Sequence, residues 1–332
     1  MSAAVLLIVS FAVILAGALA FTNAVEWLGH RLSIGEGATG SILAAVGTAM
    51  PETLIPIVAI IGGTAGSEEV AIGAIIGAPF LLATLAMALV GLSAFLFRSR
   101  RPQGLELKAD AETLDRDLVF FLVFFGGALA AGVVLPDVLH VPLAVVFLFA
   151  YLVYARRTLK GGGEVQEIHT IGRLYMDRGE DDEPPKALIG LQLAVGLGAI
   201  VGGAHLFVEE MILVAESIGV EPLVLSLILA PLATELPEKV NSFFWIREAK
   251  DSLALGNITG AMVFQSTIPV AFGLAFTDWE LDRYAVFSAS LGLAGGALAY
   301  WVLRMRGRFE LLPVIVWASL FGSFLIYVVA SS

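Results

Sequence analysis

Long apolar segments separated by short polar connections run through the whole chain. They lie near residues 3–28, 36–62, 69–97, 118–135, 141–156, 187–215, 221–246, 252–276, 284–303 and 310–330. A helix of about 20 apolar residues crosses the hydrocarbon core of a bilayer, which is about 30 Å thick. The pattern therefore predicts an all-α membrane protein with ten transmembrane helices. The longest polar stretch, a predicted cytoplasmic linker at 158–186, separates a first five-helix repeat at 1–157 from a second at 187–332.

The composition agrees with a chain that is surrounded by lipid. It is 58% hydrophobic and 15% charged, whereas soluble domains carry about 25% charged residues. The first segment lacks a basic start, so we interpret it as a retained helix rather than a signal peptide. The net charge of −11 argues against a nucleic acid partner. The chain has no cysteine and no hydrolase, zinc-peptidase or phosphate-loop motif, so we expect neither an enzyme nor a bound cofactor.

Basic residues are concentrated in alternate connections. Nearly all Lys and Arg follow the odd-numbered segments, among them Arg31, Arg101, Arg157 and Arg306, whereas the connections after the even-numbered segments hold only Arg283. Because cytoplasmic connections carry the excess of Lys and Arg, the odd connections are predicted to be cytoplasmic. Both the N and the C terminus are then outside.

The two halves of the chain resemble each other. Residues 33–52 align with 217–238, and residues 71–82 align with 254–265. Each half has five segments, an odd number, so the halves must lie in opposite orientations in the membrane. Such inverted repeats are typical of transporters that bind substrate near the bilayer midplane between interrupted helices.

A proline followed by a glutamate interrupts the apolar pattern at corresponding places, at Pro51–Glu52 and at Pro237–Glu238. Proline has no N–H and disturbs the preceding turn, which exposes carbonyl oxygens. Bare carbonyls at membrane depth are tolerated where they are buried in protein or line a cavity. Carbonyl and carboxylate oxygens suit a hard cation such as calcium or sodium. An intramembrane acid indicates a functional site, so we predict that Glu52 and Glu238 share one divalent ion.

At these residues the chain resembles the calcium/cation antiporter superfamily, and within it the prokaryotic sodium/calcium exchanger family. The first family motif, Gly-Thr-Ser-Leu-Pro-Glu, corresponds to residues 47–52 and 233–238, and the second to residues 73–82 and 256–265. The resemblance implies calcium extrusion driven by sodium or proton entry, with Glu52 and Glu238 as calcium ligands. It also implies alternating access by a mobile pair, segments 1 and 6, and a place in the inner membrane of a prokaryote. The expected partners are inorganic cations and the lipid bilayer.

Several positions depart from the family motifs. Ala78 and Ala261 replace the motif serines, Leu82 replaces the acid or amide four residues on, and Glu235 replaces the serine of segment 7. The departures deplete sodium ligands and favour, as alternatives, a proton-coupled calcium antiporter or an antiporter of another cation. An ion channel is the rival from a different class.

Other polar residues are candidates for the site or its pathway. Oxygen ligands are expected from Thr48, Thr234 and Gln265. Glu235 can bind the ion or pair with Lys239 at helical i,i+4 spacing, and Lys239 can instead stand in for a sodium ion. Asn257 either faces the pathway or bridges helices. The remaining candidates, which lie in segments 1 and 6, are Glu26, Glu209, Glu210 and the proton-sensitive His205.

Overall fold

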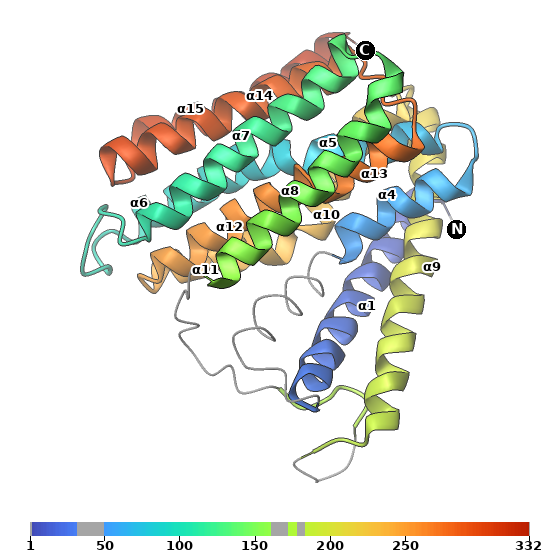
Figure 1. Ribbon diagram of the computed structural model, residues 1–332, viewed down its shortest axis with the longest axis horizontal. Helices are drawn as coiled ribbons and strands as arrows, with labels where there is room; N and C mark the ends of the chain where they lie inside the picture. The colour runs from blue at the N-terminus through green and yellow to red at the C-terminus, as the bar shows by residue number, and fades with distance from the viewer. Residues whose placement is uncertain (1, 32–49, 161–171, 178–182, 332) are drawn as a thin grey trace.

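The computed structural model describes residues 2–31, 50–160, 172–177 and 183–331, and this part of the chain is helical apart from its connections and one isolated antiparallel bridge (Figure 1). The first half holds α1 (Ala3–Arg31), α4 (Met50–Gly62), α5 (Ser67–Leu81), α6 (Met87–Leu96), α7 (Ala111–Val134) and α8 (His140–Lys160). The second half holds α9 (Lys186–Ile218), α10 (Pro222–Thr234), α11 (Leu236–Arg247), α12 (Asp251–Gln265), α13 (Ile268–Phe276), α14 (Arg283–Trp301) and α15 (Leu311–Ser331).

Eight helical segments in the described residues are long and apolar enough to cross a membrane, and two shorter apolar helices accompany them. The shorter ones lie at Pro51–Gly62 and Pro222–Leu232, within the two segments for which the sequence predicts helix breaks. In the described residues the predicted boundaries hold to within a few residues except at the start of α7, and the predicted start of the second segment lies outside these residues. That helix begins at Ala111, because the Asp110 carboxylate accepts hydrogen bonds from the backbone N–H groups of Glu112 and Thr113 and so caps it.

Helices from the two halves interlock. Helix α7 packs against α12, and α5 packs against α14; in the same way α8 packs against α13, and α6 against α15. The main core of buried residues runs through these helices. Helices α1 and α9 lie side by side at one end of the molecule, apart from the layer that contains α6, α7, α14 and α15 (Figure 1).

The described part of the central linker packs against the α1–α9 pair. The Gln192 side chain on α9 donates to the Ala20 carbonyl and the Asn23 Oδ1 of α1, at 2.8 and 2.9 Å, and accepts from the Met176 N–H at 2.9 Å. Leu174 is buried against the same two helices. One buried amide therefore joins α1, α9 and the linker.

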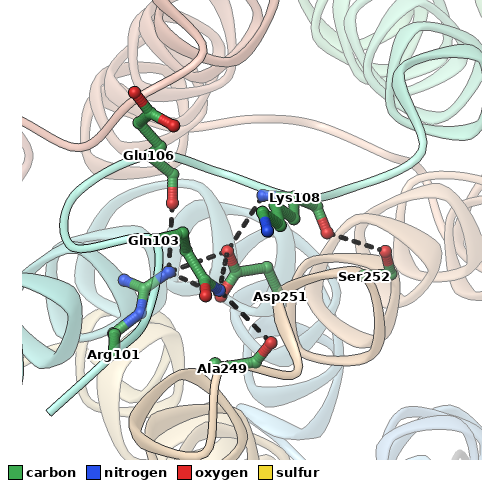
Figure 2. Close-up of polar contacts among 7 residues, drawn as sticks. All are labelled: Arg101, Gln103, Glu106, Lys108, Ala249, Asp251 and Ser252. Carbon is green, nitrogen blue, oxygen red and sulfur yellow. Dashed lines mark hydrogen bonds and ion pairs between the residues drawn. The ribbon is translucent and has the colours of Figure 1, made fainter.

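A buried ion pair joins the connection after α6 to the start of α12 (Figure 2). The Arg101 Nη2 lies 2.7 Å from both Asp251 oxygens, and both side chains are fully buried. Gln103 and the Lys108 N–H donate to the same carboxylate at 3.2 and 3.0 Å. The Ser252 hydroxyl donates to the Lys108 carbonyl at 3.1 Å. Because Asp251 also stands in the first turn of α12, the helix dipole adds to its stabilisation.

We predict that Asp251→Asn destabilises the protein by about 3–5 kcal/mol, because it leaves the Arg101 guanidinium buried without its counter-charge. Thermal and denaturant unfolding of the protein in detergent measure the loss. Ser252→Ala is the matched control, since this exposed hydroxyl makes one hydrogen bond worth about 1 kcal/mol. Equal stabilities of the two variants would show that the ion pair contributes nothing.

Candidate ion-binding site

Two short helices begin in the same way at the two motif acids. Helix α4 starts Met50-Pro51-Glu52 and α11 starts Leu236-Pro237-Glu238. In each, proline occupies the second position, where a helix needs no N–H donor. The glutamate is the third residue, in a first turn where the helix dipole favours a negative charge. Both halves of the chain therefore place a carboxylate at a helix N-terminus.

The predicted break in the second motif is confirmed. Helix α10 ends at Thr234, Glu235 leaves helical geometry with φ −94° and ψ 6°, and α11 begins at Leu236. Pro237 has no N–H to donate to the carbonyl four residues before it, so a continuous helix would lose that bond and clash there. In the first motif α4 begins at Met50. Gly47 and the predicted ligand Thr48 lie outside the described residues.

A small cavity lies between α4, α5 and α10. Its lining residues are Glu52, Ile55, Ala74, Ala78, Ala230, Pro231 and Thr234. Glu52 comes from the first motif, and Pro231 and Thr234 come from the second half, so the fold joins the two motif regions as the sequence predicts. Glu52 and Thr234 are each 8% exposed. The other lining residues that the structure describes are apolar.

Close packing of α5 on α10 forms one wall of the cavity. A Cβ placed on Gly77 would lie 2.2 Å from the Leu227 carbonyl oxygen, and one on Gly73 would lie 2.5 Å from the Leu223 carbonyl oxygen. The Ser226 hydroxyl of α10 also donates to the Val70 carbonyl of α5 at 2.7 Å. The two motif glycines of α5 are therefore packing residues: they let backbone meet backbone beside the cavity.

Glu235 and Lys239 form a buried ion pair next to the cavity. The Lys239 Nζ lies 2.6 Å from the Glu235 Oε2 and 3.3 Å from the carbonyl oxygen of Pro231, which lines the cavity. Each side chain is 2% exposed. Of the two roles predicted for Glu235, the structure shows the pairing with Lys239.

The other predicted ligands of the second half have separate surroundings. The Thr234 hydroxyl donates to the Ala230 carbonyl of its own helix at 3.1 Å while it lines the cavity. Asn257 on α12 donates to the Ser242 hydroxyl of α11 at 3.0 Å, and so bridges two helices. Gln265 is the buried last residue of α12 and does not line the cavity. Glu238 stands in α11, but its side chain is outside the described part of the structure.

The acids of α1 and α9 lie away from the cavity lining. Glu210 is buried on α9 at 7% exposure, and Glu26 is half-buried on α1. Glu209 is exposed and lies 3.3 Å from His205, one helical turn earlier. These residues keep their predicted place on segments 1 and 6, and their part in an ion pathway stays a prediction.

Sequence reasoning missed Asp117, a buried acid inside α7. Its carboxylate accepts hydrogen bonds from the Tyr154 hydroxyl of α8 at 2.9 Å and from the Thr259 hydroxyl of α12 at 2.8 Å. Arg116 lies 3.3 Å away. Because apolarity begins only at residue 118, the sequence places Asp117 in a connection. Asp110 is the sequence signal that could have placed Asp117 inside the helix. As an N-cap residue it indicates that α7 begins about two turns before Asp117.

Fold and site together define a polytopic helical membrane protein with a buried acid beside an interrupted helix. The family model described as sodium/calcium exchanger protein matches residues 2–159 and 188–330. The chain belongs to this family, which is one of transporters.

Individual relatives are distant. The chain is 27% identical over 114 residues to the putative antiporter CaxA of Alkalimonas amylolytica, which covers 34% of this chain and 36% of that protein. It is 25% identical over 280 residues to the sodium/calcium exchanger MaX1 of Methanosarcina acetivorans, covering 73% and 74% of the two chains. The crystal structure of the H⁺/Ca²⁺ exchanger CAX matches with a TM-score of 0.73 at 18% identity, over 98% of this chain and 81% of that one. This last likeness shows a shared fold.

We predict that Gly77→Ala separates α5 from α10 and costs about 1–3 kcal/mol, because overpacking forces the backbones apart. Unfolding in detergent measures this loss, and calcium uptake into proteoliposomes should fall with it. The control is Gly198→Ala on the exposed face of α9, where no described atom lies within 4 Å of the added methyl. A stable, fully active Gly77→Ala variant would contradict close packing at the cavity.

Proposed function

We propose that this protein is a secondary active antiporter that moves calcium out of the cell in exchange for sodium or protons. The observation that carries the proposal is the cavity that joins Glu52 of the first motif to Pro231 and Thr234 of the second half. Carboxylate, hydroxyl and carbonyl oxygens are ligands for a hard cation. In the proposed site Glu52 and Glu238 bind the ion, with Thr48 and Thr234 as further oxygen donors.

Coupling follows from the burial of the acids. A carboxylate in apolar surroundings is costly unless a cation or proton neutralises it. Conversion between the inward-facing and outward-facing states with an empty site and both motif glutamates charged would therefore have a high energetic cost. The protein converts between its inward-facing and outward-facing states only when a bound cation neutralises the site. That cation is either calcium or the monovalent cations or protons that replace it. This requirement ties the two fluxes together.

The proposed architecture is ten transmembrane helices in two inverted repeats, with both termini outside. It rests first on the basic residues of alternate connections. It rests also on helix contacts that occur in equivalent pairs: the contact α7–α12 corresponds to α14–α5, and the contact α8–α13 corresponds to α15–α6. In each pair the two halves of the chain have swapped roles. In this scheme α1 and α9 are corresponding helices and form the mobile pair. The same basic pattern and the prokaryotic relatives support a place in the inner membrane of a prokaryote.

Sodium and protons are the two candidate counter-ions, and the side chain of Ala78 in the cavity wall favours protons. MaX1 is named a sodium/calcium exchanger and CAX an H⁺/Ca²⁺ exchanger. Ala78 lines the cavity and presents a methyl group where the family motif has a serine hydroxyl. A methyl group cannot coordinate sodium, so this wall supports proton coupling as the alternative to sodium coupling.

We predict that Glu52→Gln lowers calcium transport about 100-fold or more, because loss of a buried counter-charge costs about 3–5 kcal/mol. Uptake of calcium-45 into proteoliposomes under separate sodium and pH gradients measures the effect and identifies the counter-ion. Glu216→Gln, an exposed acid of α9 away from the cavity, is the matched control and should transport normally. Normal transport by Glu52→Gln would refute the site.

The same vesicles separate an exchanger from a channel. Calcium uptake by an exchanger needs an ion inside the vesicle, either the counter-ion or calcium, that leaves in return. Uptake by a channel continues, driven by the calcium gradient alone. Uptake that depends on neither internal sodium nor internal pH, and continues without internal calcium, would refute the proposal.

A further inference from the structure

The buried Lys239 stands beside the proposed ion site and needs an explanation. Its ammonium group contacts the Glu235 Oε2 at 2.6 Å and the Pro231 carbonyl oxygen at 3.3 Å. Pro231 lines the cavity that contains Glu52. A carboxylate and a backbone carbonyl are the ligands that a monovalent cation such as sodium would use. The ammonium group of Lys239 therefore occupies a position between a carboxylate and a carbonyl oxygen that a bound monovalent cation could also occupy.

The charges of the motif regions can now be counted. Three of the charged residues of α4 and the broken segment 7, Glu52, Glu235 and Lys239, lie in or beside the cavity, and Glu238 precedes Lys239 in α11. Lys239 neutralises Glu235 by direct contact. In the proposed function Glu52 and Glu238 are the two carboxylates that bind the ion, and one divalent cation or two monovalent cations balance their combined charge.

We propose that Lys239 is a resident cation that fixes an electroneutral exchange, in which one calcium ion is replaced by two monovalent cations or protons. The inference rests on the proposed function, because it takes Glu52 and Glu238 as the exchanging carboxylates. The site is then neutral in both loaded states, and no net charge crosses the membrane in a cycle.

Other buried charges stand outside this balance. Asp117 is held by Tyr154, Thr259 and Arg116. Glu26 and Glu210 lie on α1 and α9 and do not line the cavity. Arg101 and Asp251 neutralise each other at the start of α12.

The test measures coupling in proteoliposomes loaded with potassium, where valinomycin sets the membrane potential. Calcium-45 accumulation is read at steady state under a fixed tenfold gradient of the driving ion, sodium or protons. Two monovalent charges per calcium give an accumulation ratio of about 100-fold that does not change with voltage. Three charges per calcium give about 1,000-fold at zero voltage. With three charges per calcium, one net elementary charge also crosses the membrane in each cycle. The accumulation ratio then changes about 50-fold per 100 mV of membrane potential.

Variants separate the charge of Lys239 from its packing. Lys239→Met leaves Glu235 without its cation, so a third monovalent charge should enter the cycle and exchange should become voltage-dependent. The double variant Glu235→Gln with Lys239→Met removes both charges and should return to the voltage-independent ratio. Lys239→Arg keeps the charge and should also be voltage-independent. The readout is the coupling ratio, which a change in expression or folded fraction does not alter.

The outcomes are distinct. If the wild-type protein exchanges calcium but its accumulation depends on voltage, the inference about Lys239 fails while the antiporter proposal stands. If Lys239→Met keeps the voltage-independent 100-fold ratio, the lysine does not set the coupling and the inference fails. If the wild-type protein shows no counter-ion-dependent calcium uptake, the proposed function itself fails.

Discussion

Burial of a carboxylate among apolar walls is the constraint on which the rest of the structure depends. Glu52 lies 8% exposed in a cavity whose lining includes Ile55, Ala74 and Ala78. Such a group is costly in a low-dielectric interior unless positive charge or donors compensate it. Part of the compensation is built into the backbone, because Glu52 occupies the first turn of α4, where N–H groups and the helix dipole favour an anion. In the proposed function the transported ion adds to this compensation, and an ion held in this way is one that the protein can exchange.

Prolines and glycines shape this site together. Pro56 and Pro231 have no N–H to donate to the carbonyls of Glu52 and Leu227, four residues before them. The Leu227 carbonyl is the group that Gly77 approaches most closely. The same residue types that weaken a helix in water thus place backbone oxygens beside a buried acid and bring the supporting helix within backbone contact.

The sequence predicted what depends on local pattern. Apolar segments gave the helices, Pro237 gave the break at Glu235, and the i,i+4 spacing gave the Glu235–Lys239 pair as one of two alternatives. It did not predict contacts between residues about 150 positions apart, such as Arg101 with Asp251, because no local pattern records them. Arg101 was counted only as a cytoplasmic positive charge. Asp117 was assigned to a connection because the apolar run begins only after it. The cap at Asp110 starts α7 before that run, so the hydrophobic pattern does not show the first part of the helix.

The contacts also locate the surface at which the proposed alternating access would act. Helices α1 and α9 are in backbone contact through Gly17 and Gly196, and Gln192 bonds both α1 and the linker, so this pair is built to move as one unit. The main core packs most of the other helices together, and the fully buried Arg101–Asp251 pair joins the connection after α6 to α12. Motion within either body would break buried polar contacts, whereas α9 meets α4 beside the cavity mainly through apolar side chains. Apolar contacts are not directional and can exchange partners at little cost. In the proposed transport cycle the pair therefore slides along α4, past Glu52, while both bodies keep their internal structure.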